Sequence, residues 1–87
     1  MTASRLTWVT KQVQLIPFGQ LVDQAACPAS HPRVIAGACG GTPGIDVKES
    51  APIENNGLWE CAIVNLSGSN SVTVKLSVLC GPPQIAQ

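Results

Sequence analysis

The sequence predicts an all-β protein, a small antiparallel β-sandwich or open barrel of about 5 to 7 short strands held by two disulfides. Three observations predict this class. Short runs rich in β-branched residues alternate with Gly-, Pro-, Asn- and Ser-containing turns. Gly, Pro and β-branched residues interrupt every window in which a helix could form. The chain also carries four cysteines in only 87 residues, and small domains commonly use disulfides to supplement a thin core.

The predicted strands follow one another at short intervals, with Pro17, PASHP, GGTPG, NNG and SGSN between or after them. They cover residues 6–16, 19–27, 33–39, 45–53, 58–65 and 71–80. Residues 45–53 are expected to form a short edge strand, because Lys48 and Pro52 hinder pairing with another chain. The last strand has the clearest alternation, with Val72, Val74, Leu76, Val78 and Cys80 on one face and Thr73, Lys75 and Ser77 on the other. A period of two over ten residues predicts a strand with one buried face.

The chain is expected to form one domain, because it has only 87 residues. A chain of this length buries only somewhat more than ~60% of its unfolded surface, so its core is thin. Residues 1–16 form its first strand or an arm for subunit contacts. Residues 17–81 form the β-domain, and residues 82–87 leave it as an extended tail.

Charge excludes two classes of partner. Five basic residues balance five acidic ones, and neither sign forms a run. Phosphate neutralisation needs a basic face, so no nucleic-acid partner is expected. The absence of a basic cluster argues against a polybasic membrane anchor, and no segment approaches the ~18 apolar residues of a membrane span. The N-terminus also lacks the apolar core of a signal peptide. No membrane partner is therefore expected.

The cysteines at positions 27, 39, 61 and 80 do not match a metal site or a catalytic site. Zinc sites in small domains usually contain close C-x2-4-C pairs, and none occurs here. A nucleophilic cysteine needs a base, and His31 is the only histidine. The five carboxylates show no spacing that singles out a catalytic pair. We therefore expect no metal, no cofactor and no enzymatic activity, and interpret the cysteines as disulfides, with buried free thiols as the alternative.

The expected strand pairing predicts which disulfides form among the three connectivities open to four cysteines. If residues 58–65 and 71–80 form a hairpin with Cys61 opposite Cys80, Ile63 lies opposite Val78. The register that joins these cysteines then also joins the apolar faces of both strands. This predicts the pairs Cys61–Cys80 and Cys27–Cys39. Disulfides persist in oxidising surroundings, so the protein is expected to act outside a reducing cytosol.

Two segments, CPASHPRVIAGACGG (27–41) and LWECAIVNLSGSNSVTVKLSVLC (58–80), resemble a β-rich module of bacterial surface proteins and phage virion proteins. The module has a Cys-Pro-Ala-Gly segment, a Gly-rich run ending in Cys, a Trp-x-Cys, and a Val/Thr strand ending in Cys. The resemblance covers about residues 20–80, although Ser30 replaces a frequent glycine and Ala36-Gly37-Ala38 replaces a glycine run. It implies a disulfide-stapled β fold. Such modules serve as stalk ends, adhesins and coat components.

Together these features predict a non-enzymatic virion structural protein, most directly a capsid decoration or cement protein. It would be made in the host cytoplasm and act outside the cell in the released particle. Its expected partners are the major capsid protein or other virion subunits and further copies of itself, for example in a trimer. Arg5, Leu6, Trp8 and Val9 are the candidate subunit contacts. Trp8 is either the anchor of this contact or an ordinary core residue.

A second hypothesis is a receptor- or glycan-binding adhesin or fibre-tip module. Sugar sites place an aromatic ring beside amides and carboxylates, and Asn55, Asn56 and Trp59 supply that combination. Against it, Trp59 shares a strand face with Cys61 and Ile63, which favours a place in the core. The sequence Asn-Leu-Ser at residues 65–67 also matches the N-glycosylation pattern. We interpret this match as a coincidence in a turn.

Overall fold

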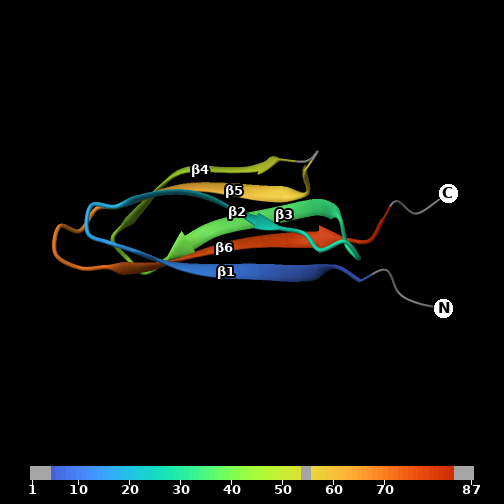
Figure 1. The fold of residues 1–87 in the computed structure, drawn as a ribbon, viewed down its shortest axis with the longest axis horizontal. Coiled ribbons are helices and arrows are strands. Elements are labelled where there is room, and N and C mark those ends of the chain that lie inside the picture. Colours follow the sequence, from blue (N-terminus) through green and yellow to red (C-terminus); the bar gives the residue numbers. More distant parts are fainter. Residues whose placement is uncertain (1–4, 54–55, 84–87) are drawn as a thin grey trace.

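A computed structural model describes residues 5–53 and 56–83 of the chain. It is all-β, as predicted, with six antiparallel strands in two three-stranded sheets that stack as a sandwich (Figure 1). The strands are β1 (Thr7–Leu15), β2 (Gln20–Ala26), β3 (Arg33–Gly41), β4 (Ile45–Ile53), β5 (Leu58–Asn65) and β6 (Val72–Gly81). Each lies within two residues of a predicted segment, because β-branched runs and Pro/Gly breaks are local signals.

The strand order is β1-β6-β3 in one sheet and β2-β5-β4 in the other. Only β4 and β5 are neighbours both in sequence and in a sheet; every other connection between consecutive strands crosses from one sheet to the other. The predicted edge position of residues 45–53 is confirmed, since β4 lies at the edge of its sheet. The molecule is elongated, with extents of 53 × 22 × 16 Å. Its long axis follows the strands (Figure 1).

The two ends of the sandwich differ in what they contain. At one end, which we call the base, β1 begins beside the end of β6, since Thr7 pairs with Cys80. At the other end, the tip, lie the connections formed by residues 16–19, 42–44 and 66–71. The base therefore holds the first and last strand residues, and the tip holds three of the crossings between sheets.

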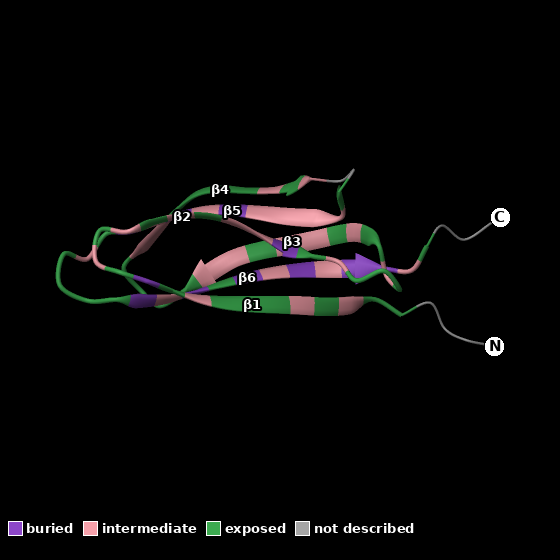
Figure 2. Ribbon diagram, viewed as in Figure 1, coloured by how far each residue is buried: buried purple, intermediate pink, exposed green. Residues whose placement is uncertain are grey.

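The core lies between the sheets and centres on β6, which has a neighbour on each side (Figure 2). The predicted inward face of this strand is confirmed, because Val72, Val74, Leu76, Val78 and Cys80 are all buried. Leu15, Ala25, Cys61 and Ile63 complete the buried apolar cluster. Burial of branched aliphatic side chains from both inner faces is the packing expected of a sandwich.

The predicted hairpin between the last two strands is wrong. β5 and β6 lie in different sheets, so Cys61 does not pair with Cys80. The disulfides are Cys27–Cys80 and Cys39–Cys61, in place of Cys61–Cys80 and Cys27–Cys39. The apolar faces of β5 and β6 do meet, but across the sandwich interior rather than side by side. Matching apolar faces therefore did not distinguish pairing within a sheet from stacking between sheets.

Candidate functional site

The part of the chain that the structure describes contains neither a metal-ligand cluster nor a pocket. Within it, no group of three or more His, Cys, Asp or Glu side chains lies close enough to hold a metal ion, and no pocket is present. All four cysteines form disulfides. His31 lies in the β2–β3 loop, where its Nδ1 is 2.9 Å from Ser30 Oγ.

The structure separates the four predicted subunit-contact residues by strand alternation. Trp8 pairs with Leu79 on the outward face of the β1-β6-β3 sheet and is 56% exposed. Leu6, 51% exposed, lies on the same face. Val9 instead pairs with Val78 and packs against the core. Arg5 is exposed just before β1. Trp8 and Leu6 are thus available for contacts, whereas Val9 holds β1 against the sandwich.

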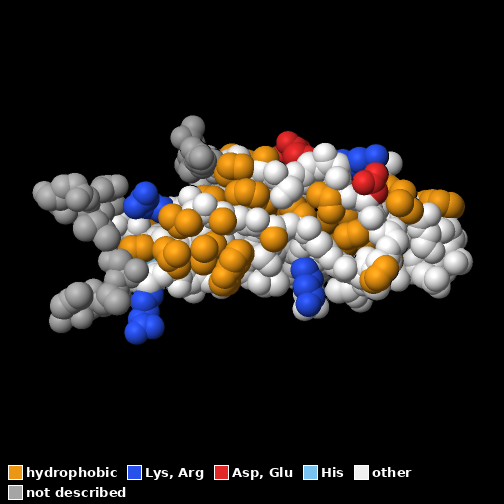
Figure 3. Space-filling view, turned by 180° about the vertical axis from the view of Figure 1, so that it is seen from behind, with side chains coloured by type: hydrophobic (Ala, Val, Ile, Leu, Met, Phe, Trp, Pro, Cys, Tyr) orange, Lys and Arg blue, Asp and Glu red, His pale blue; other side chains and the backbone are white. Residues whose placement is uncertain are grey.

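Leu6 and Trp8 belong to a larger apolar surface at the base of the sandwich. A Cβ built on Gly81 would lie 3.2 to 3.4 Å from side-chain atoms of Ile35 and Leu6, which therefore flank this glycine. Ile35 is 45% exposed. We call the group Leu6, Trp8, Ile35 and Leu79 the base patch. Figure 3 shows hydrophobic side chains gathered near this end, with Lys or Arg side chains on either side.

Three further residues of this surface were not among the predicted contacts. Leu79 continues the outward series of Thr73, Lys75 and Ser77, so the alternation of β6 already pointed to it. Arg33 lies opposite Gly81, and Ile35 sits in a β-bulge between Val34 and Ala36. A bulge shifts the alternation by one residue. No sequence signal therefore predicted that Ile35 would face outward beside Leu6.

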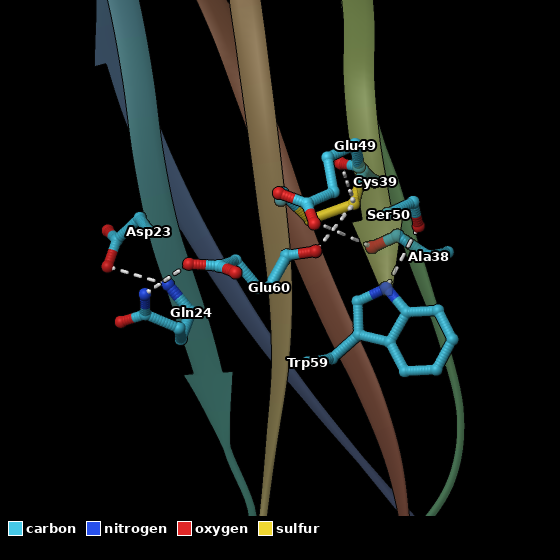
Figure 4. Close-up of a disulfide and its surroundings, with 9 residues drawn as sticks. Asp23, Gln24, Ala38, Cys39, Glu49, Ser50, Trp59 and Glu60 are labelled. Atoms are coloured by element: carbon cyan, nitrogen blue, oxygen red, sulfur yellow. Dashed lines mark hydrogen bonds between the residues drawn. A yellow bond between two sulfur atoms is a disulfide. The ribbon is translucent and has the colours of Figure 1, made fainter. Parts of the chain in front are cut away.

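Trp59, the aromatic residue of the predicted glycan contact, packs between the sheets. A Cβ built on Gly37 would lie 2.0 to 2.5 Å from its indole ring, so the ring lies directly against that glycine. The indole N–H donates a 2.9 Å hydrogen bond to Ser50 Oγ (Figure 4). One face of the ring is covered and its polar edge is occupied. Of its predicted companions, Asn56 is exposed and Asn55 lies outside the described residues.

Asn65 organises the tip and is fully buried. Its Nδ2 lies 2.8 to 3.2 Å from three backbone carbonyls, and its Oδ1 accepts a 2.9 Å hydrogen bond from the Ser67 N–H. The carbonyls belong to Leu15, Ile16 and Asn70. One side chain therefore ties the β1–β2 turn to the β5–β6 connection. In the folded protein this asparagine is not accessible to a glycosyltransferase.

The tip also presents three exposed apolar side chains. Ile16, Phe18 and Leu66 are 67%, 71% and 57% exposed. Phe18 has a φ of 55°, an unusual value for a bulky residue. Its N–H donates to the Ser67 carbonyl, and its ring lies where a Cβ on Gly68 would be. These contacts define the conformation of the turn and leave most of the ring in solvent.

An ion pair joins the two sheets along the side of the sandwich formed by β1 and β2. Lys11 Nζ lies 2.7 Å from Asp23 Oδ2. The hydrogen bond from Lys11 lowers the pKa of Asp23, although partial burial acts in the opposite direction. The Gln24 N–H also donates to this carboxylate, at 2.8 Å, and lowers the pKa further. This ion pair therefore links β1 of one sheet to β2 of the other, and its two charges neutralise each other.

Comparisons with known proteins identify no relative of this chain. No protein-family model, curated protein or solved structure matches the chain. In residues 5–53 and 56–83 no helix is long and apolar enough to span a membrane. The proposed function therefore rests on the surfaces described above.

Proposed function

We propose that the protein is a non-enzymatic structural component of a phage virion, most directly a capsid decoration or cement protein. The observation that carries the proposal is the base patch. Leu6, Trp8 and Ile35 are each between 45% and 56% exposed and lie together with Leu79. Exposed apolar groups of this kind, bordered by polar residues, are typical of protein–protein contacts.

The covalent framework is compatible with such a role. Each disulfide joins one sheet to the other: Cys27 in the β2–β3 loop to β6, and Cys39 of β3 to Cys61 of β5. The sandwich thus remains crosslinked when it is outside the cell, where disulfides persist. The resemblance of residues 20–80 to modules of virion and surface proteins supports the same assignment. On this proposal the base patch contacts another subunit of the particle, either the major capsid protein or a further copy of this chain.

Mass spectrometry of particles purified from the cells that make the protein tests the proposal. We expect the protein in the particles in a fixed ratio to the major capsid protein. A Leu6→Ser/Trp8→Ser variant should be folded but depleted from particles. Ile16→Ser, which removes a side chain that is 67% exposed at the opposite end, serves as the control and should remain incorporated. Absence of the unmodified protein from purified particles would overturn the proposal.

Glycan binding through Asn55, Asn56 and Trp59 is not supported by a comparable observation. Stacking on a sugar needs a free ring face beside polar groups. The Trp59 ring lies against Gly37, and its N–H is bonded to Ser50. We therefore propose the structural role alone.

A further inference from the structure

The charged residues of this protein are divided between the two sheets. In residues 5–53 and 56–83, Lys11 pairs with Asp23 and Lys48 pairs with Asp46, each at 2.7 Å. The other described basic residues, Arg5, Arg33 and Lys75, lie in or directly before the β1-β6-β3 sheet. The other described acidic residues, Glu49 and Glu60, lie in the β2-β5-β4 sheet. The charges outside the two ion pairs therefore give the sheets opposite signs.

The strand registers place the basic side chains on the outward face of their sheet. Lys75 alternates with the buried Val74 and Leu76, so it points away from the core. Arg33 lies opposite Gly81, next to the base patch. We call this outward surface of β1, β6 and β3, with its base patch, the basic face. It combines exposed apolar groups with positive charge.

The acidic side chains likewise lie on the outward face of the other sheet. Glu60 alternates with Trp59 and the buried Cys61, and it accepts a 3.0 Å hydrogen bond from Gln24 across the β2–β5 pair (Figure 4). Glu49 pairs with Ala62 on the same face. In Figure 3 two groups of acidic side chains lie along the upper part of the view, over the sheet that contains β4 and β5, with a Lys or Arg side chain beside one of them. We call this outward surface of β2, β5 and β4 the acidic face.

Both faces also contain apolar groups that another molecule can cover. The basic face carries the base patch, and the acidic face carries Val22, which is 64% exposed, beside Ala62. An interface of this composition gains free energy from apolar burial, and its charges select the orientation of the partners. Two identical faces would bring like charges together, which opposes symmetric stacking of the same face.

We propose that the basic face of one copy of this chain binds the acidic face of a second copy. This inference deepens the proposed function, because it specifies the contact between copies in the particle. The interface is heterologous, since different surfaces of each copy meet. A contact of this kind generates a closed ring or an extended row, according to the rotation between copies. Arg33 would face Glu49 and Glu60 of the next copy, since the strand register places these two carboxylates only two positions apart along β5.

Analytical ultracentrifugation of the purified, disulfide-bonded protein at increasing concentrations tests this interface. We expect self-association that weakens as salt is raised from about 50 to 500 mM, because salt screens exposed charges. Arg33→Glu and Glu60→Lys should each weaken association by about tenfold or more, since each places like charges opposite one another. Lys48→Glu is the matched control for Arg33→Glu. It changes the net charge equally but adds negative charge to the acidic face, so it should not weaken the association.

Mixing the two variants gives the sharpest result. Arg33→Glu makes the basic face more acidic, and Glu60→Lys makes the acidic face more basic, so the altered surfaces complement each other. An equimolar mixture should regain the association that each variant lacks alone, with both species in the complexes. Circular dichroism verifies that each variant is folded.

Three results would overturn this inference: a wild-type protein that stays monomeric up to about 1 mM, at the weak end of specific affinities, variants that associate like wild type, or a mixture without recovery. These outcomes are separate from those for the proposed function. A monomeric protein can still bind particles through the base patch, and a self-associating protein can be absent from particles.

Discussion

At the scale of single residues, Asn65 is the polar side chain that joins the connections at the tip of the sandwich. In the sequence it is the first residue of an Asn-Leu-Ser glycosylation pattern in a predicted turn. In the structure it is fully buried and contacts the backbone of two separate connections. A buried polar side chain must satisfy its hydrogen bonds within the protein. Asn65 does so by joining the turns that close the tip.

Replacing Asn65 with Asp should therefore destabilise the protein by at least about 2 kcal/mol. The new carboxylate would lose the amide hydrogen bonds and place negative charge beside three carbonyl oxygens in a buried position. Urea unfolding monitored by circular dichroism measures the change. Asn56→Asp at an exposed position is the control and should change stability by less than about 0.5 kcal/mol. Equal effects at the two positions would contradict the role assigned to Asn65.

Asp23 should contribute a pH-dependent part of the stability. Its pKa is lowered in the folded protein, chiefly by the hydrogen bond from Lys11. The folded state then holds this proton less strongly than the unfolded state. The stabilisation is complete above the unfolded pKa, near 4, and is lost as the pH falls through the folded pKa.

At pH 7, Asp23→Asn should lower the free energy of unfolding by about 0.2 to 1 kcal/mol, the usual range for an exposed ion pair. Urea midpoints for wild type and variant should converge between about pH 4 and pH 2 as the wild-type carboxylate is protonated. A difference that stays constant over that interval would show that the Asp23 charge does not stabilise the fold.

At the scale of strands and sheets, the disulfides determine how the two layers are joined. Both bridges cross from one sheet to the other, and each includes one fully buried cysteine, Cys80 or Cys61. Most of the consecutive strands also alternate between sheets. Hydrogen bonds hold each sheet together internally, while the bridges, the core and the crossings hold the sheets to each other. The disulfides therefore link the two sheets, whereas the backbone hydrogen bonds between paired strands lie within each sheet.

Removal of the two bridges should have unequal effects. The sequence separations are 53 for Cys27–Cys80 and 22 for Cys39–Cys61. The chain-entropy relation assigns losses of about 4 kcal/mol and about 3 kcal/mol to them. We expect the Cys27→Ala/Cys80→Ala variant to unfold at lower denaturant concentration than Cys39→Ala/Cys61→Ala. A non-reducing peptide map of wild type should recover the same two pairs. A Cys61–Cys80 peptide would contradict the strand order.

Gly37 should be intolerant of any side chain because of its contact with Trp59. A Cβ at Gly37 would lie 2.0 Å from a ring carbon, whereas a Cβ at Gly40 on the same strand would meet nothing within 4 Å. Gly37→Ala should therefore cost about 1 to 3 kcal/mol through overpacking, and Gly40→Ala less than about 0.5 kcal/mol. Thermal unfolding of both variants, followed by Trp fluorescence, measures the difference. Equal stability would contradict the close contact of ring and glycine.

At the scale of the whole molecule, a long narrow sandwich gives a small core and two large outward faces. The extents are 53 × 22 × 16 Å, and nine apolar residues of the described part of the chain form the buried cluster. Small domains of this kind commonly depend on crosslinks for stability. The outward faces carry exposed apolar groups and opposite charges, and both proposals depend on these faces. The same shape thus explains the need for disulfides and the surface available for contacts.

Complete reduction should unfold the protein. The two bridges together contribute about 7 kcal/mol by the chain-entropy relation, which falls within the usual total stability of about 5 to 15 kcal/mol. We expect reductant to abolish the near-ultraviolet circular dichroism of Trp59, whose ring is held between the sheets. A reduced protein that retains this signal at 37 °C would show that the core suffices without the bridges.

The sequence by itself determined the fold class, all six strand segments and the inward face of β6. These features depend on local signals: β-branched runs, turn residues and a period of two. The expectation that the cysteines form disulfides also followed from spacing and composition. For the candidate site, the alternation of β6 places Leu79 on its outward face, and the N-terminal segment supplies Leu6 and Trp8, whose role in subunit contacts stays a prediction.

The tertiary structure alone decided which strands pair, which cysteines bond and which apolar residues remain outside. Two apolar faces can be buried side by side in a hairpin or face to face in a sandwich. The pattern of β5 and β6 satisfies either arrangement equally well. The pairings of β6 with β1 and β3, and of β5 with β2, distinguish them. Each joins residues far apart in sequence, and local periodicity contains no information about such contacts.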